Sequence, residues 1–333
     1  MWRITHCARG VLRPFLTFFQ KSLKHKAMTN SNNAPSALSI WLWAARPRTL
    51  PLAASAIVLG YGLAVCSGTN NPFVFFLALV TALLLQILSN LANDYGDAVA
   101  GTDTKDRLGP LRMVAGGLTS AGSMLRAIVL ASVLAVGCGA ALVFLALWNN
   151  PVLLVFFLGL GSACVAAAIM YTMGKRPYGY YGLGDVMAGI FFGPVAVWGS
   201  AVLCGAPVSW LLFLPGMAAG FCSTMVLDVN NIRDIVTDAK AGKRTVAVRL
   251  GRVRAARYHA CLALCVILCW LVFWLAVSPV FLPGLVFAIP LARSAYLTVT
   301  RSDDAPCLNA QLKNTVIGSA VLNSGMAALI CLL

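Results

Sequence analysis

The chain has 333 residues, of which 60% are hydrophobic and only 11% are charged, and its formal net charge is +15. Apolar runs repeatedly approach the ~20 residues that cross a bilayer, and the stretches 73–87 and 151–170 carry no charge. A soluble domain would need helices with a polar face, and a β-barrel would need alternating polar and apolar residues. These features exclude both classes and predict an all-α, polytopic membrane protein.

Residues 1–36 differ from the rest because basic side chains are mixed with Phe, Leu and Trp. This segment lacks the clean apolar core and the small-residue cleavage site of a signal peptide. Met28 opens a stretch that leads directly into Trp41–Pro51, so Met1 and Met28 are both candidate start sites. We expect a dispensable basic extension on the membrane surface, followed by a single domain at residues 37–333.

The hydrophobic pattern predicts nine membrane-spanning helices, at about 49–67, 73–92, 124–147, 151–171, 185–204, 208–229, 258–277, 281–300 and 314–332. The loops on one side hold no Lys or Arg, whereas those on the other are basic, including the run 233–257. The positive-inside rule places the N-terminus and the basic loops in the cytoplasm, and the C-terminus outside a plasma (inner) membrane. The positive charge therefore reflects topology, and no nucleic-acid partner is expected.

The eleven cysteines do not predict a disulfide framework or a zinc site. Most lie inside the predicted spans, and Cys261, Cys265 and Cys269 follow helical spacing along one of them. The closely spaced pairs of zinc sites are missing. We interpret the cysteines as small apolar packing residues.

All ten acidic residues are aspartates, and two short clusters hold seven of them. The first cluster follows the second span and the other follows the sixth: Asp94, Asp97, Asp103 and Asp106, then Asp228, Asp234 and Asp238. In a helix, Asn93 and Asp97 share one face. Asn230, Asp234 and Asp238 share a face in the same way. Carboxylates are thus concentrated at two matching positions on the cytoplasmic boundary.

Two such faces, opposed across a cavity, would supply several hard oxygen ligands. Magnesium fits this site because it prefers oxygen, keeps some waters, and binds through one or two carboxylates plus substrate phosphates. A single cluster would be explained by helix capping and by nearby arginines. Two clusters in matching places favour a site for Mg²⁺ and a phosphate-bearing substrate.

A diphosphate also requires cationic side chains near the clusters. Candidates follow both clusters and occupy one short loop between them: Lys105, Arg107, Arg112, Lys175, Arg176, Lys243 and Arg244. Lys175 and Arg176 are favoured because Gly and Pro residues hold their loop close to the membrane surface. Asp185 begins the next span, where it either pairs with one of these cations or caps the helix. The positive-inside rule alone also explains each of these basic residues.

Three segments resemble the UbiA superfamily of intramembrane prenyltransferases: SNLANDYGDAVAGTDTKDRLGPLR, YTMGKRPYGYYGLGD and NNIRDIVTDAKAGKRTVAVRLG. The resemblance runs from about Trp41 almost to the C-terminus and includes ARPRTLPL and GRVRAARYHACL. Within the superfamily, these segments look most like the 1,4-dihydroxy-2-naphthoate polyprenyltransferases of menaquinone synthesis. The motifs are long and specific, which makes chance a poor explanation.

The resemblance implies a nine-helix bundle around a central cavity, with the two Asp-rich motifs facing each other over its cytoplasmic mouth. The residues that match the family's metal ligands are Asn93, Asp97, Asp234 and Asp238, with Asp94 and Asn230 in supporting positions. Many relatives have a further Asp four residues after the match to Asp97. Here that position is Gly101, so the resemblance assigns no role to Asp103 or Asp106.

The resemblance also implies transfer of a polyprenyl chain from an all-trans polyprenyl diphosphate to 1,4-dihydroxy-2-naphthoate, which yields demethylmenaquinol, CO₂ and diphosphate. We expect Asp97, Asp234 and Lys175 to support ionisation of the allylic diphosphate. The aromatic rings near the mouth either stabilise the allylic cation or anchor the membrane interface: Tyr171, Tyr178, Tyr180 and Tyr181. Arg46 or Arg48 either holds the acceptor carboxylate or snorkels to the interface.

Two alternatives remain at this stage. One is the same chemistry with another acceptor, such as 4-hydroxybenzoate, a haem or a chlorophyllide-type ring. The other is a secondary transporter that uses aspartates for ion coupling. Transporters place such acids near the bilayer midplane, whereas both clusters here lie at the cytoplasmic boundary.

Overall fold

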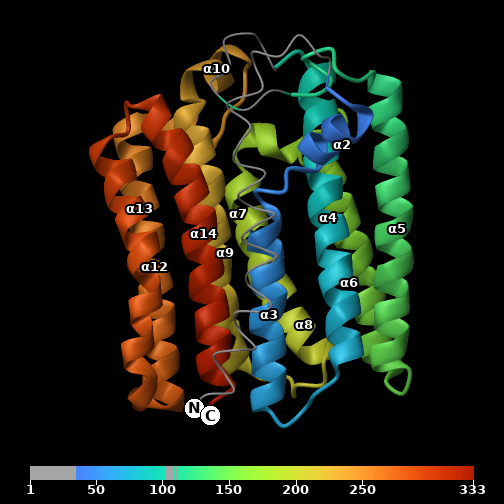
Figure 1. The fold of residues 1–333 in the computed structure, drawn as a ribbon, viewed down its shortest axis with the longest axis vertical. Coiled ribbons are helices and arrows are strands. Elements are labelled where there is room, and N and C mark those ends of the chain that lie inside the picture. The colour runs from blue at the N-terminus through green and yellow to red at the C-terminus, as the bar shows by residue number, and fades with distance from the viewer. Residues whose placement is uncertain (1–34, 103–108, 110–111) are drawn as a thin grey trace. The chain divides into compact units, whose positions relative to one another are not determined.

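In a computed structural model of the chain, residues 35–102, 109 and 112–333 are described (Figure 1). Residues Ile40–Leu333 form one compact unit. The predicted extension at 1–36 therefore lies almost wholly outside the described residues. Helices and turns account for the regular structure of the described residues, with no strand among them, which confirms the all-α prediction.

The first predicted span is a bent pair of helices, α2 (Ala37–Ala45) and α3 (Leu50–Cys66), whose axes differ by 52°. The break lies at Arg46, which has a φ of 49° and precedes a proline, a position that disfavours helical geometry. The bend is fixed to the next helix by Asn90, whose amide donates to the Ala45 carbonyl at 2.9 Å and to the Thr49 hydroxyl at 3.1 Å.

The next three long helices are α4 (Pro72–Val99), α5 (Ala121–Leu147) and α6 (Pro151–Met170). Prolines start α4 and α6, and the preceding Asn71 and Asn150 accept hydrogen bonds from first-turn backbone N–H groups. The prediction ended the second span at residue 92, but α4 continues to Val99. The first aspartate cluster is therefore partly helical.

The fifth predicted span is interrupted. It consists of α7 (Gly184–Ile190), the π-helical turn η3 (Phe191–Val195) and α8 (Ala196–Leu203). Pro194 lacks a backbone N–H, and Gly193 departs from helical geometry. A side chain at Gly193 would lie 2.7 Å from the Gly220 Cα, so glycines allow this break to press against the next helix.

The second half of the chain begins with the short turn η4 (Trp210–Leu212) and α9 (Phe213–Arg233). Two short helices follow, α10 (Ile235–Lys240) and α11 (Val246–Leu250). The next helix, α12 (Arg252–Val277), contains the seventh predicted span. The turn η5 (Pro279–Ala288) continues into α13 (Ile289–Thr300), and the last helix is α14 (Ala305–Ile330).

The described residues contain a helical segment for each of the nine predicted spans. Seven segments are long and apolar enough to cross a membrane, and the pair α2 and α3 would add an eighth. Large apolar side chains such as Val133 of α5 and Val155 of α6 are exposed, as expected for lipid-facing surfaces. The protein is a multi-pass membrane protein.

The helices of Ile40–Leu333 pack most extensively as α4 with α5, α9 with α12, and α3 with α14. Their largest apolar cluster includes the fully buried side chains of Trp270, Trp274 and Met326. All the cysteines that the structure describes are free, and Cys204 and Cys222 are buried in this cluster, consistent with a packing role. At one end of the bundle, the C-terminal turns of α4 lie at the same level as α10 (Figure 1). Both aspartate clusters therefore lie at the same end of the bundle.

Candidate active site

Of the two aspartates of the first cluster that the structure describes, Asp97 has the larger number of charged partners. Its side chain is buried in the last turns of α4. One oxygen, Oδ1, accepts from the Tyr180 hydroxyl at 2.8 Å and from the Lys243 ammonium at 2.8 Å. The other, Oδ2, accepts from the Arg112 guanidinium at 3.1 Å. Two cations and a hydroxyl therefore contact this buried carboxylate.

Asn93 lies one turn before Asp97 on the same face of α4, as the spacing predicts. Its side-chain oxygen lies 3.5 Å from the Arg112 guanidinium, which also binds Asp97. The two predicted ligands of the first cluster therefore face one common cation. Arg112 itself is 6% exposed.

Asp94 points into a different environment. Its two carboxylate oxygens accept from the backbone N–H groups of Met113 and Val114, at 2.9 and 3.0 Å. These bonds fix the segment that carries Arg112 against the end of α4. Asp94 thus supports the site by anchoring a loop.

The end of α4 explains the departure from the family pattern at residue 101. Gly101 has a φ of 68°, and the Thr102 N–H bonds back to the Asp97 carbonyl at 3.0 Å. This is the left-handed helix ending that glycine favours, because a side chain there would be strained. Asp103 and Asp106 lie outside the described residues.

The second cluster is organised around a buried arginine. Arg233, 1% exposed, donates to both carboxylate oxygens of Asp234, at 2.7 and 2.5 Å. It also donates to the side-chain oxygens of Asn230 at 2.7 Å and Asn309 at 2.9 Å. Arg233 therefore holds Asp234 and Asn230 in place and joins the end of α9 to the start of α14.

Lys243 connects the two clusters. Its ammonium lies 2.8 Å from Asp97 and 4.0 Å from Asp238, and its side chain is 13% exposed. The backbone N–H of Lys243 also bonds to the Asp238 carbonyl at 2.9 Å. The two motifs, far apart in the sequence, thus meet across one basic side chain.

The loop between α6 and α7 contributes the turn η2 (Tyr178–Tyr181), which is tied to the second cluster. The Arg244 N–H donates to the Tyr180 carbonyl at 2.8 Å, and the Arg249 guanidinium donates to the Tyr181 carbonyl at 2.7 Å. Gly182 has a φ of 80°, and a side chain at this position would lie only 2.8 Å from the Arg244 carbonyl oxygen, so glycine suits it. These contacts aim the Tyr180 hydroxyl at Asp97.

Two further tyrosines build the inside of this loop. The Tyr171 ring packs edge-on against Tyr178, and a side chain at Gly179 would lie 2.6 Å from it. Burial raises the pKa of Tyr178 to about 12, so its hydroxyl stays protonated and donates to the Ala167 carbonyl at 2.8 Å. Tyr178 therefore has a structural role in the loop.

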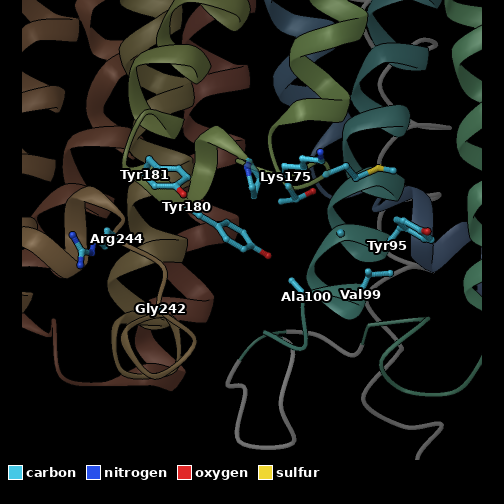
Figure 2. A pocket seen from close by; sticks show the side chains of 13 residues that line it. Tyr95, Val99, Ala100, Lys175, Tyr180, Tyr181, Gly242 and Arg244 are labelled. Atoms are coloured by element: carbon cyan, nitrogen blue, oxygen red, sulfur yellow. The ribbon is translucent and has the colours of Figure 1, made fainter.

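A pocket of about 720 Å³ lies beside these residues (Figure 2). Its walls come from the end of α4, the loop 172–177, the turn η2 and the loop after α10. Lys175 and Arg244 are the basic residues among those lining it, and Tyr180 lies between Arg244 and Ala100 in Figure 2. A cavity with two cations and a tyrosine that binds Asp97 suits an anionic ligand.

Comparison with known proteins identifies the family. The model of the UbiA prenyltransferase family matches residues 53–314, which include both aspartate clusters. The chain belongs to the UbiA prenyltransferase family.

Curated UbiA relatives include the 1,4-dihydroxy-2-naphthoate octaprenyltransferase of Escherichia coli strain K12, which is 46% identical over 294 residues. That match covers 86% of this chain and 94% of the relative. The protein of the same name from Mycobacterium tuberculosis is 42% identical, over 77% of this chain and 84% of the relative. A solved UbiA homolog from Archaeoglobus fulgidus, bound to DMAPP and Mg²⁺, superposes with a TM-score of 0.62 at 17% identity, covering 88% and 99% of the two chains. It confirms the fold.

In this UbiA family member, the other predicted site residues fall in different places. Lys175 and Arg176 are both exposed, and of this pair Lys175 lines the pocket whereas Arg176 does not. Arg46 lies at the bend between α2 and α3, and Arg48 is exposed there. Lys105 and Arg107 lie outside the described residues.

Asp185 forms an ion pair with neither Lys175 nor Arg176, and its side chain does not cap α7. It is buried inside the bundle, where its carbonyl accepts from the Thr224 hydroxyl at 3.0 Å. Nearby, the fully buried Asp228 and His259 lie 3.2 Å apart and join α9 to α12. The Asp185 side chain instead lies near Tyr258 of α12 and Asp228 of α9, so neither sequence interpretation of it matches the structure.

The described residues offer no group of three acidic, histidine or cysteine side chains close enough to hold a metal ion by themselves. The oxygen atoms of the two clusters nevertheless suit Mg²⁺. The Lys243 ammonium shows that a cation is favourable between Asp97 and Asp238. These residues fit a metal that completes its coordination with diphosphate oxygens, as Mg²⁺ commonly does.

Proposed function

We propose that this UbiA prenyltransferase transfers a polyprenyl chain from an all-trans polyprenyl diphosphate to 1,4-dihydroxy-2-naphthoate, giving demethylmenaquinol. The observation that carries the proposal is the 46% identity with the Escherichia coli 1,4-dihydroxy-2-naphthoate octaprenyltransferase, across 94% of that protein. The position of both aspartate clusters at one end of an apolar bundle supports it. Neither the transporter alternative nor another aromatic acceptor has comparable support.

In the reaction, one bond breaks and one bond forms at each of two atoms, the allylic carbon and the carboxyl-bearing ring carbon. The allylic C–O bond breaks, and its electron pair leaves with the diphosphate. The carboxyl-bearing ring carbon of the acceptor forms a new C–C bond to the allylic carbon. The carboxylate then leaves as CO₂, and the electrons of that C–C bond restore the aromatic ring.

In this proposal the two clusters hold Mg²⁺ together with the diphosphate, through Asn93, Asp97, Asp234 and Asp238. The ion supplies Lewis-acid stabilisation of the leaving diphosphate. Lys175 and Arg244 line the pocket, and we assign them to the diphosphate oxygens. Lys105, Arg107 and Arg176 remain proposed diphosphate contacts from the flanking loops.

The allylic cation requires shielding from water and a stabilising environment. We propose that the aromatic faces of Tyr171, Tyr180 and Tyr181 contribute, because η2 and the end of α6 lie beside the clusters. Arg46 or Arg48 is the proposed partner of the acceptor carboxylate. Arg46 is the better placed of the two, because it is only partly exposed and lies at the bend beside α4.

We also propose that the active end of the bundle faces the cytoplasm of a plasma (inner) membrane, with the C-terminus outside. The support is the concentration of basic residues in the loops at that end. A topology reporter fused after Leu333 should show that the C-terminus lies outside the cytoplasm. A reporter signal from the cytoplasmic side would contradict the proposed orientation.

The decisive experiment uses the purified protein in detergent with 1,4-dihydroxy-2-naphthoate, Mg²⁺ and polyprenyl diphosphates of several lengths. We expect a product whose mass equals the acceptor plus the prenyl group, minus the carboxyl group. Replacing the acceptor with 4-hydroxybenzoate provides the matched comparison. Preferred turnover of 4-hydroxybenzoate would contradict the acceptor assignment, and turnover that persists after complete metal chelation would remove Mg²⁺ from the mechanism.

A further inference from the structure

The Lys243 ammonium lies between the two clusters, where a bound metal cation would also be stabilised. It is 2.8 Å from Asp97 and 4.0 Å from Asp238, which belong to different clusters. It also lies 4.7 Å from the centre of the Tyr180 ring, and the hydroxyl of that ring bonds to Asp97. A carboxylate pair and an aromatic face therefore hold this ammonium at the junction of the two motifs.

The backbone around Lys243 is fixed, whereas its side chain can reach more than one partner. The N–H groups of Lys243 and Arg244 bond to the carbonyls of Asp238 and Tyr180, at 2.9 and 2.8 Å. Gly242, with a φ of 76°, makes the turn that allows both bonds. From this anchor, the flexible four-carbon stem of lysine allows the ammonium to change partners without movement of the loop.

The same contacts oppose the binding of a divalent ion by itself. A metal approaching Asp97 must displace the ammonium from Oδ1 or the Arg112 guanidinium from Oδ2. Opposite charges this close attract each other strongly near a protein surface, so this displacement is costly. The described residues also provide no preformed group of three metal-binding side chains to offset the cost. A diphosphate changes the balance because it brings acceptor oxygens for both the metal and the displaced ammonium.

We propose that Lys243 keeps the space between Asp97 and Asp238 neutralised until the diphosphate arrives, and then moves to the diphosphate oxygens. The divalent ion therefore binds tightly only together with the diphosphate. This assignment rests on the proposed function, since it assumes that the metal and the diphosphate share this site. It makes Lys243 a diphosphate-binding residue that also sets the order of binding.

The test is calorimetric titration of the purified full-length protein with Mg²⁺, alone and with inorganic diphosphate present. The wild-type protein should bind Mg²⁺ alone weakly and bind it at least about ten-fold more tightly with diphosphate. Lys243→Met should bind Mg²⁺ alone at least about ten-fold more tightly than the wild type, and diphosphate at least about ten-fold more weakly. The control Lys240→Met, an exposed lysine of α10, should match the wild type in every titration.

Each outcome separates this inference from the proposed function. If Lys243→Met binds Mg²⁺ alone no more tightly than the wild type, Lys243 does not keep the metal out of the space between Asp97 and Asp238. The proposed site for Mg²⁺ and diphosphate is unaffected by that result. If the wild type binds no Mg²⁺ even with diphosphate, the proposed metal site fails first. Lys243→Gln is the second variant, with the same expectation, in case the methionine protein is not monodisperse.

Discussion

Asp94 and Asp97 lie about one helical turn apart in α4, and both are buried. Asp94 accepts two backbone N–H groups from the segment after the cluster, whereas Asp97 faces Tyr180, Lys243 and Arg112. Sequence spacing does not separate these environments, because both residues precede the same loop. The partners of Asp97 come from positions 15, 83 and 146 residues away. Arg112 and Lys243 were predicted only as general diphosphate cations, and their contact with Asp97 carried no local signal.

Asp97→Asn should reduce prenyl transfer by at least about 100-fold. The neutral amide cannot form ion pairs with both Lys243 and Arg112 as a carboxylate does. Losing one preorganised electrostatic contact commonly lowers the rate by roughly 10²–10³-fold. Product formation under saturating substrates measures the effect, with size-exclusion chromatography to confirm that the variant remains folded. Wild-type turnover by a folded Asp97→Asn protein would overturn the assignment of Asp97 to the site.

Asp94→Asn should act mainly on stability. An amide retains one acceptor oxygen and leaves either Met113 or Val114 without its bond, which costs about 1–3 kcal/mol for a buried donor. We expect a lower midpoint when detergent-solubilised protein is heated stepwise and the monodisperse fraction is measured. Unchanged thermal stability, together with a loss of activity equal to that of Asp97→Asn, would place Asp94 in the reaction rather than in the loop.

The close approach of α4 to the loop 172–177 positions the first cluster among its neighbours. Gly96 lies between Asp94 and Asp97, and a side chain there would be 2.5 Å from the Thr172 carbonyl oxygen. The Thr172 hydroxyl donates in turn to the Ala92 carbonyl at 2.9 Å. This contact brings the end of α4 towards η2, which carries Tyr180.

Gly96→Ala should therefore weaken both the fold and the reaction. The added methyl group must push α4 away from the loop, and overpacking of this kind typically costs about 1–3 kcal/mol. We expect activity to fall at least about ten-fold, because moving α4 away from the loop also separates Asp97 from the Tyr180 hydroxyl. The matched control is Gly137→Ala in α5, where a side chain meets no atom within 4 Å. If both variants keep full activity and stability, the close approach has no functional importance.

At the scale of the whole molecule, the described parts of both aspartate clusters lie at one end of an apolar bundle. The catalytic proposal uses residues from Arg46 onwards, and the family match begins at residue 53. The basic extension at 1–36 lies outside that match. Its mixture of basic and apolar residues still predicts a membrane-surface segment rather than a part of the site.

A protein that begins at Met28 should retain prenyl transfer within about two-fold of the full-length chain. The extension contributes no predicted ligand, so its loss should affect membrane association at most. Activity of membranes that contain equal amounts of the two proteins, quantified by immunoblot, is the measurement. A truncated protein that inserts normally but is inactive would show that the extension is not dispensable.

Hydrophobic run length and helical spacing were enough to predict the all-α membrane fold, the basic end of the bundle and the two aspartate clusters. The sequence also placed Lys175 near the site. Three features became visible in the folded protein alone: Asp185 lies inside the bundle, Arg233 holds Asp234, and Lys243 joins Asp97 to Asp238. The reason is physical. A hydrogen bond between residues far apart in the chain depends on how the helices and loops fold back on one another, and that packing leaves no local periodicity in the sequence.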